Sequence, residues 1–134
     1  MNTTILKKES VIHPELSFLV NGILFDTRKK LGIFCNEKQY CDHIEQLLKE
    51  KGISYEREFV LPESFEGEQK GRNKVDFLID DKIVLEIKAK KSLVKDDYYQ
   101  TQRYLIATNK QLAILINMRQ YSVTPKRILN NNFS

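Results

Sequence analysis

Two short segments in which every second side chain is apolar, residues 74–80 and 82–90, constrain the fold more than any other feature of the chain. In an extended strand, successive side chains point to opposite faces, so every second residue shares a face. If the segments pair as an antiparallel hairpin, their apolar faces must coincide, because a shift by one residue would expose half of the apolar set to water. The predicted apolar face consists of Val75, Phe77, Ile79, Ile83, Leu85, Ile87 and Ala89.

The same pairing brings two acidic side chains together on the opposite face. A connection of three residues, 80–82, pairs Phe77 with Leu85 and sets Asp76 directly opposite Glu86, whereas other odd loop lengths keep the faces matched but shift the partner. Directly opposed residues have Cβ atoms about 4.5–5.5 Å apart, and like charges there repel each other. The hairpin therefore needs a compensating charge.

A divalent cation is one way to hold two opposed carboxylates. Oxygen ligands suit Mg²⁺ or Mn²⁺, and Lys88, two residues after Glu86 on the same face, could orient or deprotonate an attacking water. The alternative is a polar, solvated hairpin face on which lysines neutralise the acids. The spacing alone leaves both interpretations open.

Helical patterns precede and follow this hairpin. Apolar spacing predicts a first helix from Pro14 up to Gly32 and a second over residues 37–51, with Asn36 as N-cap and Gly52 as the stop. Strands are expected at residues 55–62, 74–80, 82–90, 112–116 and 120–127, with a third helix that is capped by Asp96 or Asp97 and runs to about Thr108. The order ααβββαββ predicts an α+β domain with a mixed sheet flanked by helices.

Length and composition set the limits of this domain. The 134 residues suit one domain over residues 13–128, with a flexible segment 1–12 and a tail 129–134. No apolar segment reaches the ~20 residues of a membrane span, and no secretion signal is evident. Cys35 and Cys41 lack paired zinc spacing, so we expect reduced thiols and a cytoplasmic protein. A net charge of +4 is compatible with a nucleic-acid partner.

Two residues outside the hairpin are further candidates for the site. Glu37 falls on the inward face at the start of the second helix, although a first-turn acid can also simply complement the helix dipole. Gln100 lies one turn before Tyr104 on the third helix, where most glutamines are surface residues. Position alone does not decide either case.

The spacing D-x9-E-x-K from Asp76 to Lys88 resembles the core of the PD-(D/E)XK nuclease superfamily. The wider chain resembles the GxxExxxR family of small bacterial and archaeal proteins within it, from about Glu15 to Met118. Matching stretches are Glu15-Leu16-Ser17, Gly22, Leu31-Gly32, Glu37, Tyr40, Lys51-Gly52-Ile53, Glu56-Arg57-Glu58, Leu61-Pro62, Val75-Asp76, Leu85-Glu86-Ile87-Lys88, Gln100, Tyr104-Leu105 and Leu115-Ile116-Asn117.

The resemblance implies a restriction-endonuclease-like fold and a Mg²⁺- or Mn²⁺-dependent nuclease acting on nucleic acid. It implies that Asp76 and Glu86 are metal ligands, with Lys88 as the catalytic lysine. It also implies that Glu37 is an additional acid and that Gln100 lies near the scissile phosphate. Three positions depart from the family pattern, which are Ile33, Phe34 and Cys41 in place of its proline, glycine and arginine.

We expect Lys90, Lys91 and Arg103 to contact backbone phosphates, which gives binding that is independent of base sequence and sensitive to salt. Two alternatives remain. A catalytically inactive nucleic-acid-binding module of the same fold is favoured by the departures at Phe34 and Cys41. A protein-interaction domain, such as a homodimer, could use the apolar residues of the first helix.

Overall fold

The computed structural model describes residues 12–134, in which helices lie on both faces of a five-stranded sheet. In chain order the elements are α2 (Pro14–Leu31), α3 (Glu37–Glu50), β1 (Tyr55–Val60), β2 (Lys74–Ile79), β3 (Ile83–Lys88), α4 (Lys95–Thr108), β4 (Leu112–Asn117) and β5 (Lys126–Leu129). The predicted α+β class and the order ααβββαββ are confirmed.

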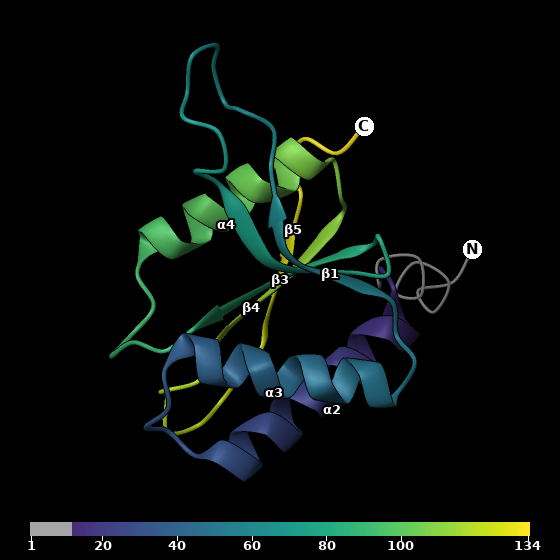
Figure 1. Ribbon diagram of the computed structural model, residues 1–134, viewed down its shortest axis with the longest axis vertical. Helices are drawn as coiled ribbons and strands as arrows, with labels where there is room; N and C mark the ends of the chain where they lie inside the picture. Colours follow the sequence, from purple (N-terminus) through teal and green to yellow (C-terminus); the bar gives the residue numbers. More distant parts are fainter. Residues whose placement is uncertain (1–11) are drawn as a thin grey trace, which may run out of the picture.

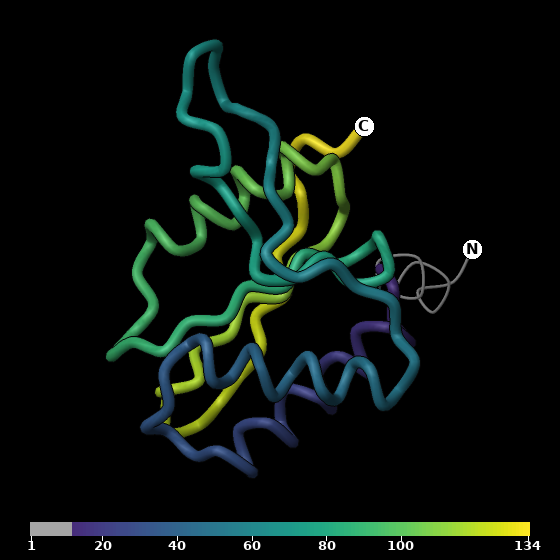
Figure 2. The backbone as a smooth tube through the Cα atoms, viewed as in Figure 1, coloured from purple at the N-terminus to yellow at the C-terminus, as the bar shows by residue number. Residues whose placement is uncertain are grey.

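The strands lie side by side in the order β1-β2-β3-β4-β5. Only β3 and β4 are parallel, because α4 carries the chain back across the sheet between them. Helices α2 and α3 cover one face and α4 covers the other, as Figure 1 shows. The tube in Figure 2 shows β3 and β4 running together toward the end of the sheet where α3 begins. This end holds the residues of the candidate site.

Local sequence signals position the two N-terminal helices. Pro14 occupies the first turn of α2, and Gly32 ends it with a φ of 74° that an L side chain rarely adopts. The Asn36 side chain accepts from the Gln39 amide, and the Gln39 side chain accepts in return from the Asn36 amide, which forms a capping box at the start of α3. These caps place Glu37 in the first turn of α3.

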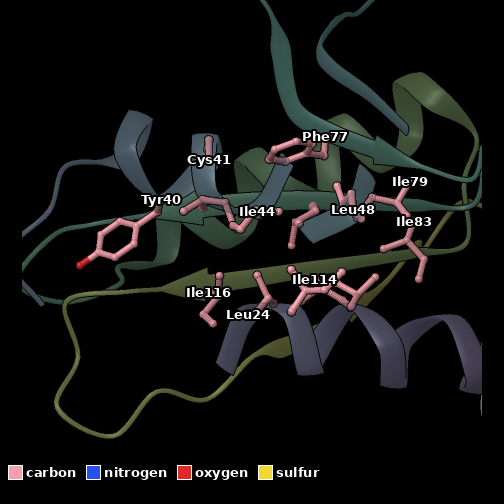
Figure 3. Close-up of a cluster of buried hydrophobic side chains, with 14 of the residues drawn as sticks. Leu24, Tyr40, Cys41, Ile44, Leu48, Phe77, Ile79, Ile83, Ile114 and Ile116 are labelled. Carbon is pink, nitrogen blue, oxygen red and sulfur yellow. The ribbon is translucent and has the colours of Figure 1, made fainter. Parts of the chain in front are cut away.

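The sheet is buried on both faces, so the alternative of a polar, solvated hairpin face is wrong. One apolar cluster fills the space between the sheet and helices α2 and α3 (Figure 3). A second lies on the α4 side and contains Leu78, Val84 and Tyr104. Val75 belongs to this second cluster, away from Phe77, because the regular pairing of β2 is interrupted at the intervening residue.

The predicted register of the hairpin is confirmed where β2 and β3 pair. Phe77 lies opposite Leu85, and Ile79 lies opposite Ile83. The connection turns sharply because Asp80 and Asp81 both adopt positive φ, which Asp tolerates better than most residues. The three-residue connection was therefore the right alternative among the odd loop lengths.

The last strand is displaced from its expected position at residues 120–127. It begins at Lys126, directly after Pro125, and pairs antiparallel with β4 through to Leu129. Residues 118–121 form a loop instead, because the Arg28 guanidinium binds the carbonyls of Met118, Gln120 and Tyr121. Sequence alternation alone could not reveal that these carbonyls are bound by a helix about ninety residues earlier.

The start of α4 also differs from the prediction. The helix begins at Lys95, with Val94 as N-cap. Asp97, the third residue of the helix, accepts a hydrogen bond of 2.7 Å from the Val94 amide. The expected flexible segment 1–12 lies outside the described residues except for Ile12, and the proposed domain limits stay predictions. No helix of residues 12–134 combines the length and the apolarity that crossing a membrane requires.

Candidate active site

Asp76 and Glu86 meet where β2 and β3 separate. Continuing the register of Phe77 and Leu85 would place the two acids opposite each other, but regular backbone pairing stops before them. The carboxylates take over the backbone contacts: the Asp76 amide donates to Glu86 Oε1 at 3.0 Å, and the Ile87 amide donates to Asp76 Oδ2 at 2.7 Å. Each side chain is thus held by the opposite strand.

Burial of this pair disfavours its charged forms. Glu86 is only 4% exposed. Desolvation, followed by the neighbouring charge of Asp76, raises the pKa of Glu86. Desolvation also raises the pKa of Asp76, although the hydrogen bond from the Ile87 amide opposes the shift. A cation bound beside the two acids would offset this effect by favouring their charged forms.

A hollow of about 270 Å³ opens beside Asp76. Its walls come from the start of α3 and from β1 and β2, and it is lined by Glu37, Lys38, Cys41, Arg57, Glu58 and Asp76. The structure thus brings Glu37, which the family resemblance implies as an additional acid, to the same cavity as Asp76. Glu86 lies behind Asp76 and does not line this hollow.

Lys88 and Gln100 form a second contact on the side of α4. The Lys88 ammonium donates to Gln100 Oε1 at 3.1 Å, and both side chains are half-buried. Glu86 and Lys88 are two residues apart on β3 and therefore share a face, the one that α4 covers. Each predicted residue of the core site therefore contacts, or shares a cavity with, another member.

Glu58 is a residue of this hollow to which we assigned no role from its spacing. The β1–β2 pairing skips it, running through Arg57 opposite Phe77 and resuming at Phe59 opposite Val75. Its φ of 52° lies in the left-handed region, which is rare for a strand residue and often marks a functional position. No local signal predicts this conformation, because it arises from the interruption of the sheet beside Asp76.

Arg57 and Lys38 are the two basic residues that line the hollow, and Arg57 is held there by several contacts. Its guanidinium binds Asp42 at 2.7 Å and Glu45 at 3.0 Å, both on α3, and packs 5.9 Å from the centre of the Phe77 ring. Cys41, which stands where the family pattern has arginine, is buried, and desolvation raises the pKa of its thiol. The thiol therefore cannot supply the charge that an arginine would carry there.

The expected phosphate-contacting residues have different surroundings. Lys90 is paired with Asp97 at 2.9 Å, while Lys91 is exposed on the loop that follows β3. Arg103 is exposed on α4 and lines a separate hollow with Pro62 and Ser64 of the β1–β2 connection. The structure thus leaves Lys91 the freest of the three, with Arg103 beside a different cavity.

Buried Asn117 fixes the end of β3, a role that spacing did not reveal. Its side chain accepts from the Lys90 amide at 3.0 Å and donates to the Lys90 carbonyl at 2.8 Å. This double contact ties the segment after Lys88 to the end of β4. The signal in the sequence is a polar residue directly after an apolar strand.

Within residues 12–134, no three His, Cys, Asp or Glu side chains converge in a ready-made metal site. Two carboxylates can nevertheless serve Mg²⁺, which usually keeps several waters and uses only one or two protein carboxylates. The hydrogen bonds to the backbone use one oxygen of Asp76 and one of Glu86, which leaves Oδ1 and Oε2 for a cation. The chemistry of this donor pair fits a hydrated Mg²⁺ or Mn²⁺.

The family model of the PD-(D/E)XK nuclease superfamily matches residues 14–128. The match covers all eight described elements except the last residue of β5, so the chain belongs to this superfamily. The mixed sheet and its flanking helices are consistent with the restriction-endonuclease-like fold. No curated protein and no solved structure matched the chain. Superfamily membership indicates a nuclease.

Proposed function

We propose that this protein is a metal-dependent nuclease that hydrolyses phosphodiester bonds, and that it belongs to the GxxExxxR family. The observation that carries the proposal is the buried contact between Asp76 and Glu86, with each carboxylate bound to the opposite strand. Burying two acids side by side destabilises the metal-free fold, so a function is needed to explain why both are present. Within a nuclease superfamily, that function is the binding of a divalent cation.

Asp76 and Glu86 would hold Mg²⁺ or Mn²⁺, with Glu37 reaching the same hollow from α3. Bound there, the cation would supply positive charge at the phosphate and lower the pKa of a bound water. The backbone hydrogen bonds keep the two carboxylates in place before substrate arrives, which reduces the cost of organising the site. Asp76 lines the hollow and is thus the ligand nearer to substrate.

Lys88 is the proposed catalytic lysine. Its ammonium can stabilise negative charge that develops on the phosphate, or hold the attacking water. Gln100 accepts one of its protons at 3.1 Å and so fixes the direction of the side chain from α4. Two further ammonium protons remain for water and phosphate.

Nucleic acid is the proposed partner, bound chiefly through its backbone. Lys91 is exposed on the loop that follows β3, three residues after Lys88, and Lys90 and Arg103 are the other candidate phosphate contacts. Such contacts are independent of base sequence, and their affinity falls as salt is raised. Lys90 is bound to Asp97, so its contribution requires that this ion pair open or bridge to the phosphate.

The proposal is tested with labelled single- and double-stranded DNA and RNA in Mg²⁺ or Mn²⁺. We expect wild-type cleavage, and at least a 100-fold loss in Asp76→Ala and Lys88→Ala, which is a typical order of magnitude for removing charge stabilisation. Lys74→Ala is a matched control, because Lys74 is exposed on the same strand as Asp76. Cleavage that survives both substitutions would refute the assignment.

A Mn²⁺ titration by calorimetry separates metal binding from turnover. Wild type should release or absorb heat on binding, whereas Asp76→Ala should not. Metal binding and nucleic-acid binding without cleavage would identify an inactive module of the same fold. The replacement of the family arginine by Cys41 is the observation that favours this second function.

A further inference from the structure

The outer surface of α2 carries an exposed stripe in which residues recur at alternating intervals of three and four. We define this stripe as Glu15, Phe18, Gly22, Phe25 and Lys29. All five are exposed, and Phe18 and Phe25 are exposed by 77% and 48%. This spacing is the a/d pattern by which one helix packs along another. The helix buries its opposite side against the domain, which leaves the stripe exposed to solvent.

The domain itself does not explain the residue at the centre of the stripe. Glycine inside a helix is unfavourable compared with alanine, and it is retained where another backbone must come close. A Cβ added at Gly22 would meet no atom within 4 Å among the described residues. The close approach that Gly22 permits is therefore one that the described fold does not use.

We propose that two copies of this chain form a homodimer in which their α2 helices pack antiparallel and cross at Gly22. A two-fold axis at this residue relates position n of one helix to position 44 − n of the other. It places Phe25 of each copy against Leu19 of its partner. Such an isologous contact uses the same stripe twice and closes on itself.

The surface around Leu19 has the shape that this arrangement needs. In helix packing, one side chain enters a space between residues i, i+3, i+4 and i+7 of the facing helix. Here these four residues are Glu15, Phe18, Leu19 and Gly22. An apolar hollow of about 370 Å³ lies at this position and is lined by Glu15, Phe18 and Leu19 together with Pro14. The partner's Phe25 is the side chain that would fill it.

Charge complementarity selects a second copy in the antiparallel orientation. The relation 44 − n brings Glu15 at one end of the stripe beside Lys29 of the partner subunit, so two ion pairs flank the aromatic centre. A parallel pair would instead oppose like charges at both ends. The ends of the stripe are thus complementary to its own reversed copy.

The first test measures molecular mass by sedimentation equilibrium over a range of protein concentrations. We expect wild type to reach twice the chain mass of 15.8 kDa as concentration rises. Phe25→Asp should weaken dimerisation at least about 10-fold, because the two-fold axis makes the substitution remove both of the symmetric Phe25 contacts. Phe34→Asp is the matched control, since Phe34 is 92% exposed in the α2–α3 loop and lies outside the stripe. Circular dichroism checks that both variants are folded.

Charge exchange then tests the orientation. Glu15→Lys and Lys29→Glu should each weaken the dimer, whereas the double variant should recover the affinity of wild type. A folding defect could not produce this recovery. Equal loss in the double variant, or dimers unaffected by Phe25→Asp, would overturn the proposal. A full-length chain that stays monomeric at every concentration would overturn it too. This holds even if removal of residues 1–11 allows dimerisation, because the result would mean that the chain's own N-terminus covers the stripe.

Discussion

Replacing Glu86 with glutamine should stabilise the metal-free protein at pH 8. Glutamine has nearly the shape of glutamate, and its carbonyl oxygen can still accept from the Asp76 amide, as Glu86 Oε1 does at 3.0 Å. What the substitution removes is a carboxyl group that is only 4% exposed and lies beside a second carboxylate. The residue proposed to bind metal is therefore expected to oppose folding when no metal is present.

The magnitude follows from the pKa of Glu86, which burial and the charge of Asp76 raise from 4.5 to about 8. At ~1.4 kcal/mol per unit, this shift corresponds to roughly 4–5 kcal/mol of lost stability once the group is ionised. The hydrogen bond from the Asp76 amide is already part of this net shift, but the buried NH2 group of glutamine has no partner among the described residues and costs about 1–2 kcal/mol. We therefore expect Glu86→Gln to raise the free energy of unfolding at pH 8 by about 2–4 kcal/mol.

The advantage should depend on pH with a defined sign. Because the folded-state pKa of Glu86 lies above its unfolded-state value, the folded protein binds more protons than the unfolded chain between these two values. The ionisation of Glu86 should thus lower the free energy of unfolding of wild type as the pH rises from about 4.5 to about 8. At pH 4.5 the difference between wild type and Glu86→Gln should shrink to about 1 kcal/mol or less.

Urea unfolding in a chelating buffer at pH 4.5, 6 and 8 measures this difference directly. Glu56→Gln is the matched control, because it neutralises an exposed acid on β1 and should change stability by less than about 0.5 kcal/mol. If Glu86→Gln were no more stable than wild type at pH 8, or equally advantaged at all three pH values, the electrostatic reasoning would be wrong.

Three further substitutions test how the site is built. Glu58→Gly should raise the free energy of unfolding by about 1 kcal/mol in urea, because glycine accepts the φ of 52° without strain, whereas Glu56→Gly in extended backbone should lower it. Asn117→Ala should cost about 1–3 kcal/mol and speed hydrogen exchange at the Lys90 amide, since it removes both contacts to that residue. In a cleavage assay, Gln100→Ala should lower kcat about 10-fold with little change in KM, and Gln100→Glu, which keeps the oxygen acceptor, should retain most of the rate.

The sequence predicted the elements well where the signal was local. Proline, capping side chains and glycine limit α2 and α3, and these residues act over one turn of helix. The register of β2 and β3 was predictable in part, because burying both apolar sets admits only odd loop lengths, of which the structure has the three-residue connection. The shared cavity of Glu37 and Asp76 came from residue patterns and the family resemblance together.

The tertiary structure decided what depends on distant contacts. Spacing placed Asp76 opposite Glu86, but it did not reveal that backbone pairing stops there and that both carboxylates bind amides of the facing strand. Nor did it reveal Glu58 at the hollow, or the loop that Arg28 holds in place of an early last strand. A short polar segment has no preference strong enough to choose between pairing and loop, so partners far along the chain decide.

The hairpin and its acids were therefore determined by the sequence itself, since the alternation of side chains and the burial of apolar surface admit few arrangements. The sequence did not determine the pKa values of those acids. Their raised pKa values come first from burial, which arises only when the helices cover the sheet, and then from the charge of Glu37 beside Asp76 and that of Asp76 beside Glu86. The outward stripe of α2 shows the same division: its spacing is written in the sequence, but only the folded domain decides that this side of the helix stays exposed.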